Sequence, residues 1–166
     1  MRAGVALGSN LGNRLGNLRE ARAKIEAFCD APASALASAI YETDPVGCEA
    51  GAPKFLNAVL DFECARDPHD LVRELIQIEE SLGRSADHAK NSSRTIDLDL
   101  LYFGDVEIQT SELALPHPRI AQRKFVLQPL ADIRPDLILP GKDETVSALL
   151  AQLVEGPAVV RSPTQW

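Results

Sequence analysis

Two segments of the chain have the apolar spacing of an α-helix. Hydrophobic residues recur every three or four positions in residues 11–28 and again in residues 71–82. The second segment also carries boundary signals, because Asp67-Pro68 supplies an N-cap with proline in the first turn and Gly83 supplies a C-terminal stop. Two further helices are predicted nearer the C-terminus, at residues 125–133 and 144–154.

Strands are predicted before and between these helices. Residues 55–63 alternate with a two-residue period, so Phe55 and Asn57 share one face of a strand. Shorter apolar runs predict further strands at residues 5–7, 35–43 and 94–103. The order strand, helix, strand, strand, helix, strand is the split βαβ pattern of a ferredoxin-like α+β domain with a mostly antiparallel sheet. We expect helices on one face of that sheet, additional C-terminal helices, and one domain over residues 1–166.

The segment Ser92–Phe103, SSRTIDLDLLYF, combines a buried strand pattern with two carboxylates. Side chains two apart in a strand lie on the same face, so Asp97 and Asp99 project together, about 6.6 Å apart, while the leucines face the core. Two ionised carboxylates side by side repel each other, which favours a positive partner. Mg²⁺ prefers carboxylate oxygen, and Arg94 is placed to reach phosphates held by such ions. The alternative is a solvated strand face on which acids merely alternate with leucines.

Composition restricts the classes of function. With 45% hydrophobic and 25% charged residues, the chain has the balance of a globular protein. No apolar run approaches the roughly 18 residues of a membrane span, and the first residues do not form a secretory signal, so we expect a cytoplasmic protein with reduced cysteines. The net charge of −7 argues against sequence-independent nucleic-acid binding. Residues 113–131 nevertheless lack acids and contain several basic side chains, which suits a small anionic ligand as well as a solvated basic loop.

Three other features have a chemistry of their own. Phe55 and Asn57 place an aromatic ring beside an amide, a pair that can stack on a flat heterocycle and hydrogen-bond its edge. The turn GSNLG at residues 8–12 lacks the lysine of a phosphate-binding P-loop and is interpreted as an ordinary strand-to-helix turn. His117 lies between two prolines, where a local hydrogen bond is more typical than catalysis.

Taken together, the motifs resemble those of the 6-hydroxymethyl-7,8-dihydropterin pyrophosphokinase family of folate biosynthesis. The most specific is R-x-x-D-L-D-L at Arg94–Leu100, and the others follow in the family's order over nearly the whole chain. They are GSNLG at 8–12, Y-x-T-x-P-x-G at 41–47, FLNA at 55–58, LGR at 82–84, LPHPR at 115–119 and FVLQPL at 125–130.

The resemblance implies a ferredoxin-like enzyme that transfers pyrophosphate from ATP to the hydroxymethyl group of the pterin and releases AMP. Two Mg²⁺ ions would be held across the ATP phosphates by Asp97 and Asp99, and Arg84 and Arg94 would complete the catalytic group. Implied nucleotide-binding residues are Glu79, Arg84, Arg94, Leu100, His117 and Arg123. Implied pterin-binding residues are Thr43, Val46, Phe55, Asn57 and Phe125, with the ring between the two phenylalanines.

Two long loops, residues 44–54 and 84–93, would act as lids over the substrates. The second loop departs from the family pattern: Ser92-Ser93 replaces Gly-Pro, and positions that often hold a basic or an aromatic side chain are occupied by Ala86, Asp87 and Asn91. Two alternatives therefore stay open, a weakened pterin- and ATP-binding module of the same fold and a different phosphotransferase that would release ADP. We expect ATP and the pterin as small-molecule partners, no nucleic acid or membrane, and a monomer.

Overall fold

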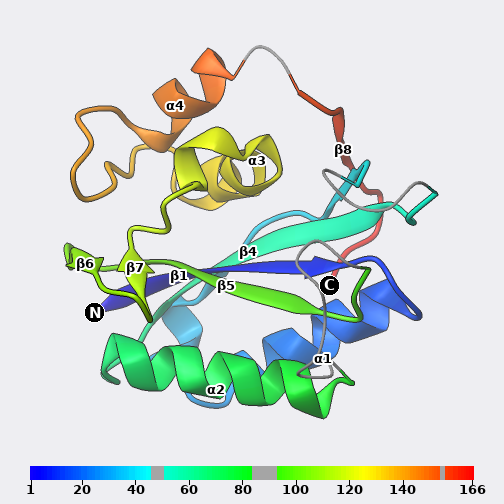
Figure 1. Ribbon diagram of the computed structural model, residues 1–166, viewed down its shortest axis with the longest axis horizontal. Coiled ribbons are helices and arrows are strands. Elements are labelled where there is room, and N and C mark those ends of the chain that lie inside the picture. Colours follow the sequence, from blue (N-terminus) through cyan, green and yellow to red (C-terminus); the bar gives the residue numbers. More distant parts are fainter. Residues whose placement is uncertain (46–50, 84–92, 154–155) are drawn as a thin grey trace.

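The computed structural model describes residues 1–45, 51–83, 93–153 and 156–166. Its centre is a mostly antiparallel sheet, which lies between two groups of helices in Figure 1. The strands lie in the order β5 (Asp97–Phe103), β1 (Arg2–Ser9), β4 (Phe55–Glu63), β3 (Tyr41–Thr43) and β8 (Val159–Arg161), and β2 (Leu36–Ala37) also pairs with β4. The first four positions of this order are those of a ferredoxin-like sheet, which confirms the predicted fold class.

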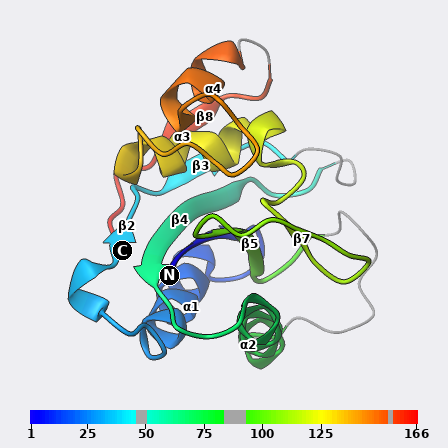
Figure 2. The ribbon, with the colours of Figure 1, turned by 90° about the vertical axis from the view of Figure 1, so that its left-hand side faces the viewer.

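Helices cover both faces of the sheet, as the two views show (Figures 1 and 2). On one face α1 (Arg14–Glu26) and α2 (Pro68–Ser81) pack against β1 and β5. On the other face α3 (Lys124–Ile133) packs against β4 and carries α4 (Val146–Gln152). The expectation of helices on one face was therefore incomplete. Strand β4 is buried on both sides, so a second layer of helices is needed to cover its other face.

Short elements complete the chain. Two 3₁₀ turns and a small two-stranded sheet connect the larger elements: η1 (Pro32–Ser34), η2 (Ile120–Gln122), β6 (Ile108–Gln109) and β7 (Ala114–Leu115). Within the described ranges, no helix combines the length and the apolar character required to span a membrane.

The helix boundaries follow from local chemistry. In α2 the Asp67 carboxylate accepts the His69 N–H at 2.8 Å, and the helix is followed by Gly83 with a positive φ of 90°, as predicted. Helix α1 begins later than its apolar pattern, at Arg14, with Asn13 as N-cap. Leu11 stays outside the helix, because its backbone N–H donates to the carbonyl of Arg94.

The predicted strand over residues 35–43 is divided in two. Ser38 interrupts it: the Ser38 hydroxyl accepts the backbone N–H of Val59, in place of a main-chain carbonyl, at 2.9 Å. Strand β8, which pairs with β3, was not predicted.

A buried carboxylate links the sheet to α3. The Asp61 side chain is fully buried and accepts hydrogen bonds from Tyr102 Oη at 2.6 Å and Arg2 Nε at 2.5 Å, with Arg134 Nη1 3.5 Å away. Burial, together with the Asp61 charge, raises the pKa of Tyr102 above its ordinary value, so its hydroxyl remains a donor. Gly4 has to be glycine here, because a Cβ at this position would collide with the Tyr102 ring.

Asp61→Ala should lower the free energy of unfolding by about 1–3 kcal/mol, because the buried Tyr102 hydroxyl would lose its acceptor, while Arg2 is partly exposed and keeps a backbone acceptor. Urea denaturation would measure this loss. The matched control is Glu74→Ala, which removes a surface pair with Arg66 and should cost about 1 kcal/mol or less. Equal losses in both variants would mean that the buried network is not a special source of stability.

Candidate active site

The strand registers place the two predicted halves of the site in one row across the sheet. Asp97 of β5 is opposite Gly8 of β1, and Gly8 is opposite Asn57 of β4. Residues directly opposite in a sheet project to the same face. Two residues along their strands, Asp99 and Phe55 share that face, which is the one covered by α3.

Asp97 and Asp99 each form an ion pair with one arginine. Arg94 Nη1 donates to Asp97 Oδ1 at 2.6 Å, and Arg123 Nη1, immediately before α3, donates to Asp99 Oδ2 at 2.9 Å. The aspartate side chains remain about a third exposed, at 29% and 34%, so both can be reached from solvent. Two arginines thus supply positive charge beside the carboxylates, and the four charges cancel locally, while the two Mg²⁺ ions expected there stay a prediction.

His117 is held beside Asp99 by a bulge in β5. The register with β1 shifts between Gly4 and Val5, and the freed carbonyl of Leu101 accepts the backbone N–H of His117 at 2.8 Å. Nδ1 of His117 accepts the backbone N–H of Arg119, so the ring proton of the neutral form is on Nε2, 3.9 Å from Asp99 Oδ2. Burial lowers the pKa of His117, outweighing the Asp99 charge that raises it. The ring is therefore a neutral donor at neutral pH.

Two of the predicted pterin-binding residues, Asn57 and Phe55, lie next to Gly8. Asn57 Nδ2 donates to Thr43 Oγ1 at 2.8 Å, and both residues are buried. A Cβ on Gly8 would lie 3.2 Å from Asn57 Oδ1, 3.8 Å from the Phe55 ring and 3.9 Å from Asp97 Cβ. Glycine therefore keeps open the space where the amide, the aromatic ring and the carboxylate meet.

Phe125 belongs to the same region through Arg123. The Arg123 guanidinium lies 5.6 Å from the centre of the Phe125 ring while it also pairs with Asp99. Arg123 thus connects the carboxylate side of the site with the aromatic side.

Glu79 and Leu100 lie at the edge of β5 that does not pair with β1. Glu79 is buried, and its Oε1 accepts the Leu98 N–H at 2.7 Å. The Leu100 side chain belongs to the core with α1 and α2, on the face opposite Asp97, so any contact of Leu100 with a ligand has to use its backbone. A nucleotide contact of Glu79 stays a prediction.

Two predicted residues, Val46 and Arg84, lie outside the described residues, as do residues 86, 87, 91 and 92 of the unusual loop. Their roles stay predictions, as does the action of the two loops as lids.

Sequence reasoning missed the contribution of the GSNLG turn, which was interpreted as an ordinary connection. Gly8 supplies the open space described above, and Asn10 is buried and bonds both the Pro53 carbonyl and Ser93 Oγ. A usable signal was present in the sequence, because a polar residue directly after a fully buried strand needs hydrogen-bond partners.

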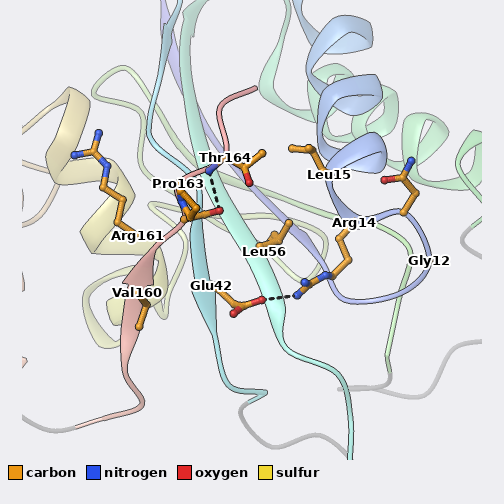
Figure 3. A pocket seen from close by; sticks show the side chains of 11 residues that line it. Gly12, Arg14, Leu15, Glu42, Leu56, Val160, Arg161, Pro163 and Thr164 are labelled. Atoms are coloured by element: carbon orange, nitrogen blue, oxygen red, sulfur yellow. Dashed lines mark hydrogen bonds and ion pairs between the residues drawn. The ribbon is translucent and has the colours of Figure 1, made fainter.

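A pocket of about 540 Å³ lies on the opposite face of the sheet (Figure 3). It is lined by Arg14, Glu42 and Leu56, among others. Glu42 and Leu56 are neighbours of Thr43 and Asn57 on their strands and point the other way, so this pocket is not the candidate site.

Comparison with known proteins identifies the family. The family model of 7,8-dihydro-6-hydroxymethylpterin-pyrophosphokinase matches residues 4–135. The chain belongs to this family. A 2-amino-4-hydroxy-6-hydroxymethyldihydropteridine pyrophosphokinase of Bacillus subtilis is 43% identical over 129 residues, which are 78% of this chain and 75% of the relative. Its counterpart in Synechocystis is 33% identical over 149 residues, covering 90% and 74%. The predicted family and enzyme class are confirmed.

Larger relatives contain a similar part. A folate synthesis bifunctional protein of Arabidopsis thaliana is 38% identical over 129 residues, but the matched part is only 26% of its length. The crystal structure of Plasmodium falciparum HPPK-DHPS with pteroate superposes with a TM-score of 0.72 at 15% identity, covering 92% of this chain and 42% of that one. At that identity the likeness concerns the fold.

In the ligand-free chain, NMR titration of the His117 ring should give a pKa below 6.5, because burial outweighs the attraction of Asp99. The unfolded chain then binds this proton more readily, so the stability linked to His117 is complete above about pH 6.5 and declines as the pH falls below it. His117→Gln would identify the resonance and remove this part of the pH dependence. A measured pKa above 6.5 would contradict the prediction, since the Asp99 charge would then dominate.

Proposed function

We propose that this chain transfers pyrophosphate from ATP to the hydroxymethyl group of 6-hydroxymethyl-7,8-dihydropterin and releases AMP. One observation carries the proposal beyond family membership: Asp97, Gly8 and Asn57 lie in one row on one face of the sheet. An anion-handling group and a group suited to a heterocycle are thereby adjacent, as a reaction between a nucleotide and a pterin requires.

The residues present fit two Mg²⁺ ions. Mg²⁺ is usually bound by one or two carboxylates together with substrate phosphates and water, and Asp97 and Asp99 are two accessible carboxylates on one face. Bound there, the ions would neutralise charge on the ATP phosphates. Arg94 and Arg123, which now pair with the aspartates, are close enough to exchange these partners for phosphate oxygens, which guanidinium groups bind well.

The protein's own groups would position the substrates. His117 donates from Nε2 and so can hydrogen-bond a phosphate oxygen, but it cannot accept the pterin hydroxyl proton at that nitrogen. Charge neutralisation and alignment dominate phosphoryl transfer. We assign alignment to the neutral His117, and both contributions to the arginines.

The backbone of Leu100 is the nucleotide contact that the sheet geometry supports. Leu98 directs its N–H away from β1 to Glu79, and alternate residues of an antiparallel strand direct their backbone groups to the same side. Leu100 thus offers its backbone at the outer edge of β5, where the flat edge of a base can hydrogen-bond.

For the pterin we propose Asn57 and Thr43 at the edge of the ring and Phe55 and Phe125 at its faces. The Asn57–Thr43 hydrogen bond fixes the amide orientation, and Gly8 keeps the adjoining space open. The same proposal also predicts that Val46 contacts the pterin and that two Mg²⁺ ions bind. It further predicts a monomer with a cytoplasmic location.

The deciding experiment incubates the chain with Mg²⁺, ATP and 6-hydroxymethyl-7,8-dihydropterin and separates the nucleotides by chromatography. We expect AMP that forms only when the pterin is present. Pterin-dependent ADP would indicate simple phosphorylation by a different phosphotransferase. Bound pterin without any nucleotide product would support the weakened binding module.

Asp97→Asn and Asp99→Asn should each lower the rate of AMP formation by at least about 10²–10³-fold, because a neutral amide holds Mg²⁺ more weakly than a carboxylate and the charge on the transferring group would be less neutralised. Thermal unfolding should show that both variants stay folded. Asp105→Asn, an exposed position just after β5, is the matched control and should keep its activity. Near-normal rates in either site variant would remove that aspartate from the proposed metal site.

A further inference from the structure

Asn10 joins two segments that lie far apart in the sequence. Its side-chain Nδ2 donates to the carbonyl of Pro53 at 3.3 Å and to Ser93 Oγ at 3.1 Å. Its Oδ1 accepts the backbone N–H of Arg94 at 2.7 Å, and its own backbone N–H bonds the Arg94 carbonyl at 3.2 Å. The residue is 2% exposed, so these contacts are made without competition from bulk water.

Only a side-chain amide of this length can make all these bonds. Two donors and one acceptor are needed at once, which an Asp carboxylate or a Ser hydroxyl cannot supply. The orientation of the amide is also determined, since the reverse would place its NH₂ group against the Arg94 N–H and its oxygen against the Pro53 carbonyl.

The two segments carry the two halves of the site. Arg94 reaches Asp97, on the metal and nucleotide side. Pro53 lies two residues before Phe55, where β4 and the pterin side begin. On the opposite face of the sheet Arg14 pairs with Glu42 (Figure 3). Arg14 also donates to the carbonyl of Lys54, next to Pro53, at 2.7 Å, so the start of β4 is held from both faces.

We propose that Asn10 is a positioning residue that sets the distance between the nucleotide half and the pterin half of the site. This inference rests on the proposed function. Asn10 touches neither substrate. It fixes the backbone of Arg94 relative to the chain that enters Phe55, so its loss disturbs the alignment of the two bound substrates more than the binding of either one.

The variants Asn10→Ala and Asn10→Asp test this role. The first removes every side-chain bond, and the second keeps the volume and the acceptor for Arg94 but loses both donors. With both substrates saturating and Mg²⁺ present, the single-turnover rate of AMP formation should fall about 10–10²-fold, the effect of a misalignment near 1 Å. The Kd of the pterin alone, and that of a non-hydrolysable ATP analogue with Mg²⁺ alone, should stay close to the wild-type values. If Asn10→Ala does not fold, the comparison is made with Asn10→Asp.

Asn17→Ala is the matched control, because Asn17 also anchors this turn. Its Nδ2 bonds Ser9 Oγ, the Leu11 carbonyl and the Thr95 carbonyl, but it does not bond Pro53. This variant should be less stable to heat yet turn over at close to the wild-type rate.

Three results would overturn the inference: an unchanged rate in the Asn10 variants, an equal loss of rate in Asn17→Ala, or a loss of rate fully explained by weaker binding of one substrate alone. These results differ from a failure of the proposed function, which would appear as a wild-type chain that forms no AMP.

Discussion

The two-residue period of strand β5 is the constraint on which the site depends. Leu98 and Leu100 are buried against α1 and α2, and the same alternation turns Asp97 and Asp99 to the α3 face. A slip of one residue would bury both carboxylates and expose the leucines, so the hydrophobic core itself determines the register. Pairing with β1 on one edge and the Glu79–Leu98 hydrogen bond on the other hold that register in place.

A chain with a net charge of −7 binds a nucleotide only if its charges are arranged locally. The arginines at positions 94 and 123 pair with the two aspartates, Arg119 directly precedes η2, and Lys124 begins α3. At physiological ionic strength, salt strongly screens the interaction between exposed charges that are more than about 8 Å apart. Surface acids farther than this from the two aspartates therefore have little effect there. The immediate surroundings of the phosphates therefore matter more than the overall charge.

How far the sequence predicts this structure depends on how local each cause is. Helix α2 was predictable because its cap, its apolar stripe and its terminal glycine are adjacent, and β4 because its alternation is uninterrupted. The two-residue period also predicted that Asp97 and Asp99 share one face of their strand, as the register with β1 shows, whereas the roles of these residues stay predictions. The break at Ser38 was not predictable, since it depends on a hydrogen bond to Val59, which only the folded sheet brings near. The role of Asn10 likewise depends on partners more than 40 residues away along the chain.

Strand β8 is formed by residues that follow the segment matched by the family model. The family model matches residues 4–135, whereas β8 is formed by Val159–Arg161 and hydrogen-bonds to β3, the strand of Thr43. Without β8, β3 would present unpaired backbone groups at the edge of the sheet, and a strand of another molecule could pair with them. The C-terminal segment thus covers the backbone edge of β3 and limits aggregation through that edge, while it contains none of the predicted site residues.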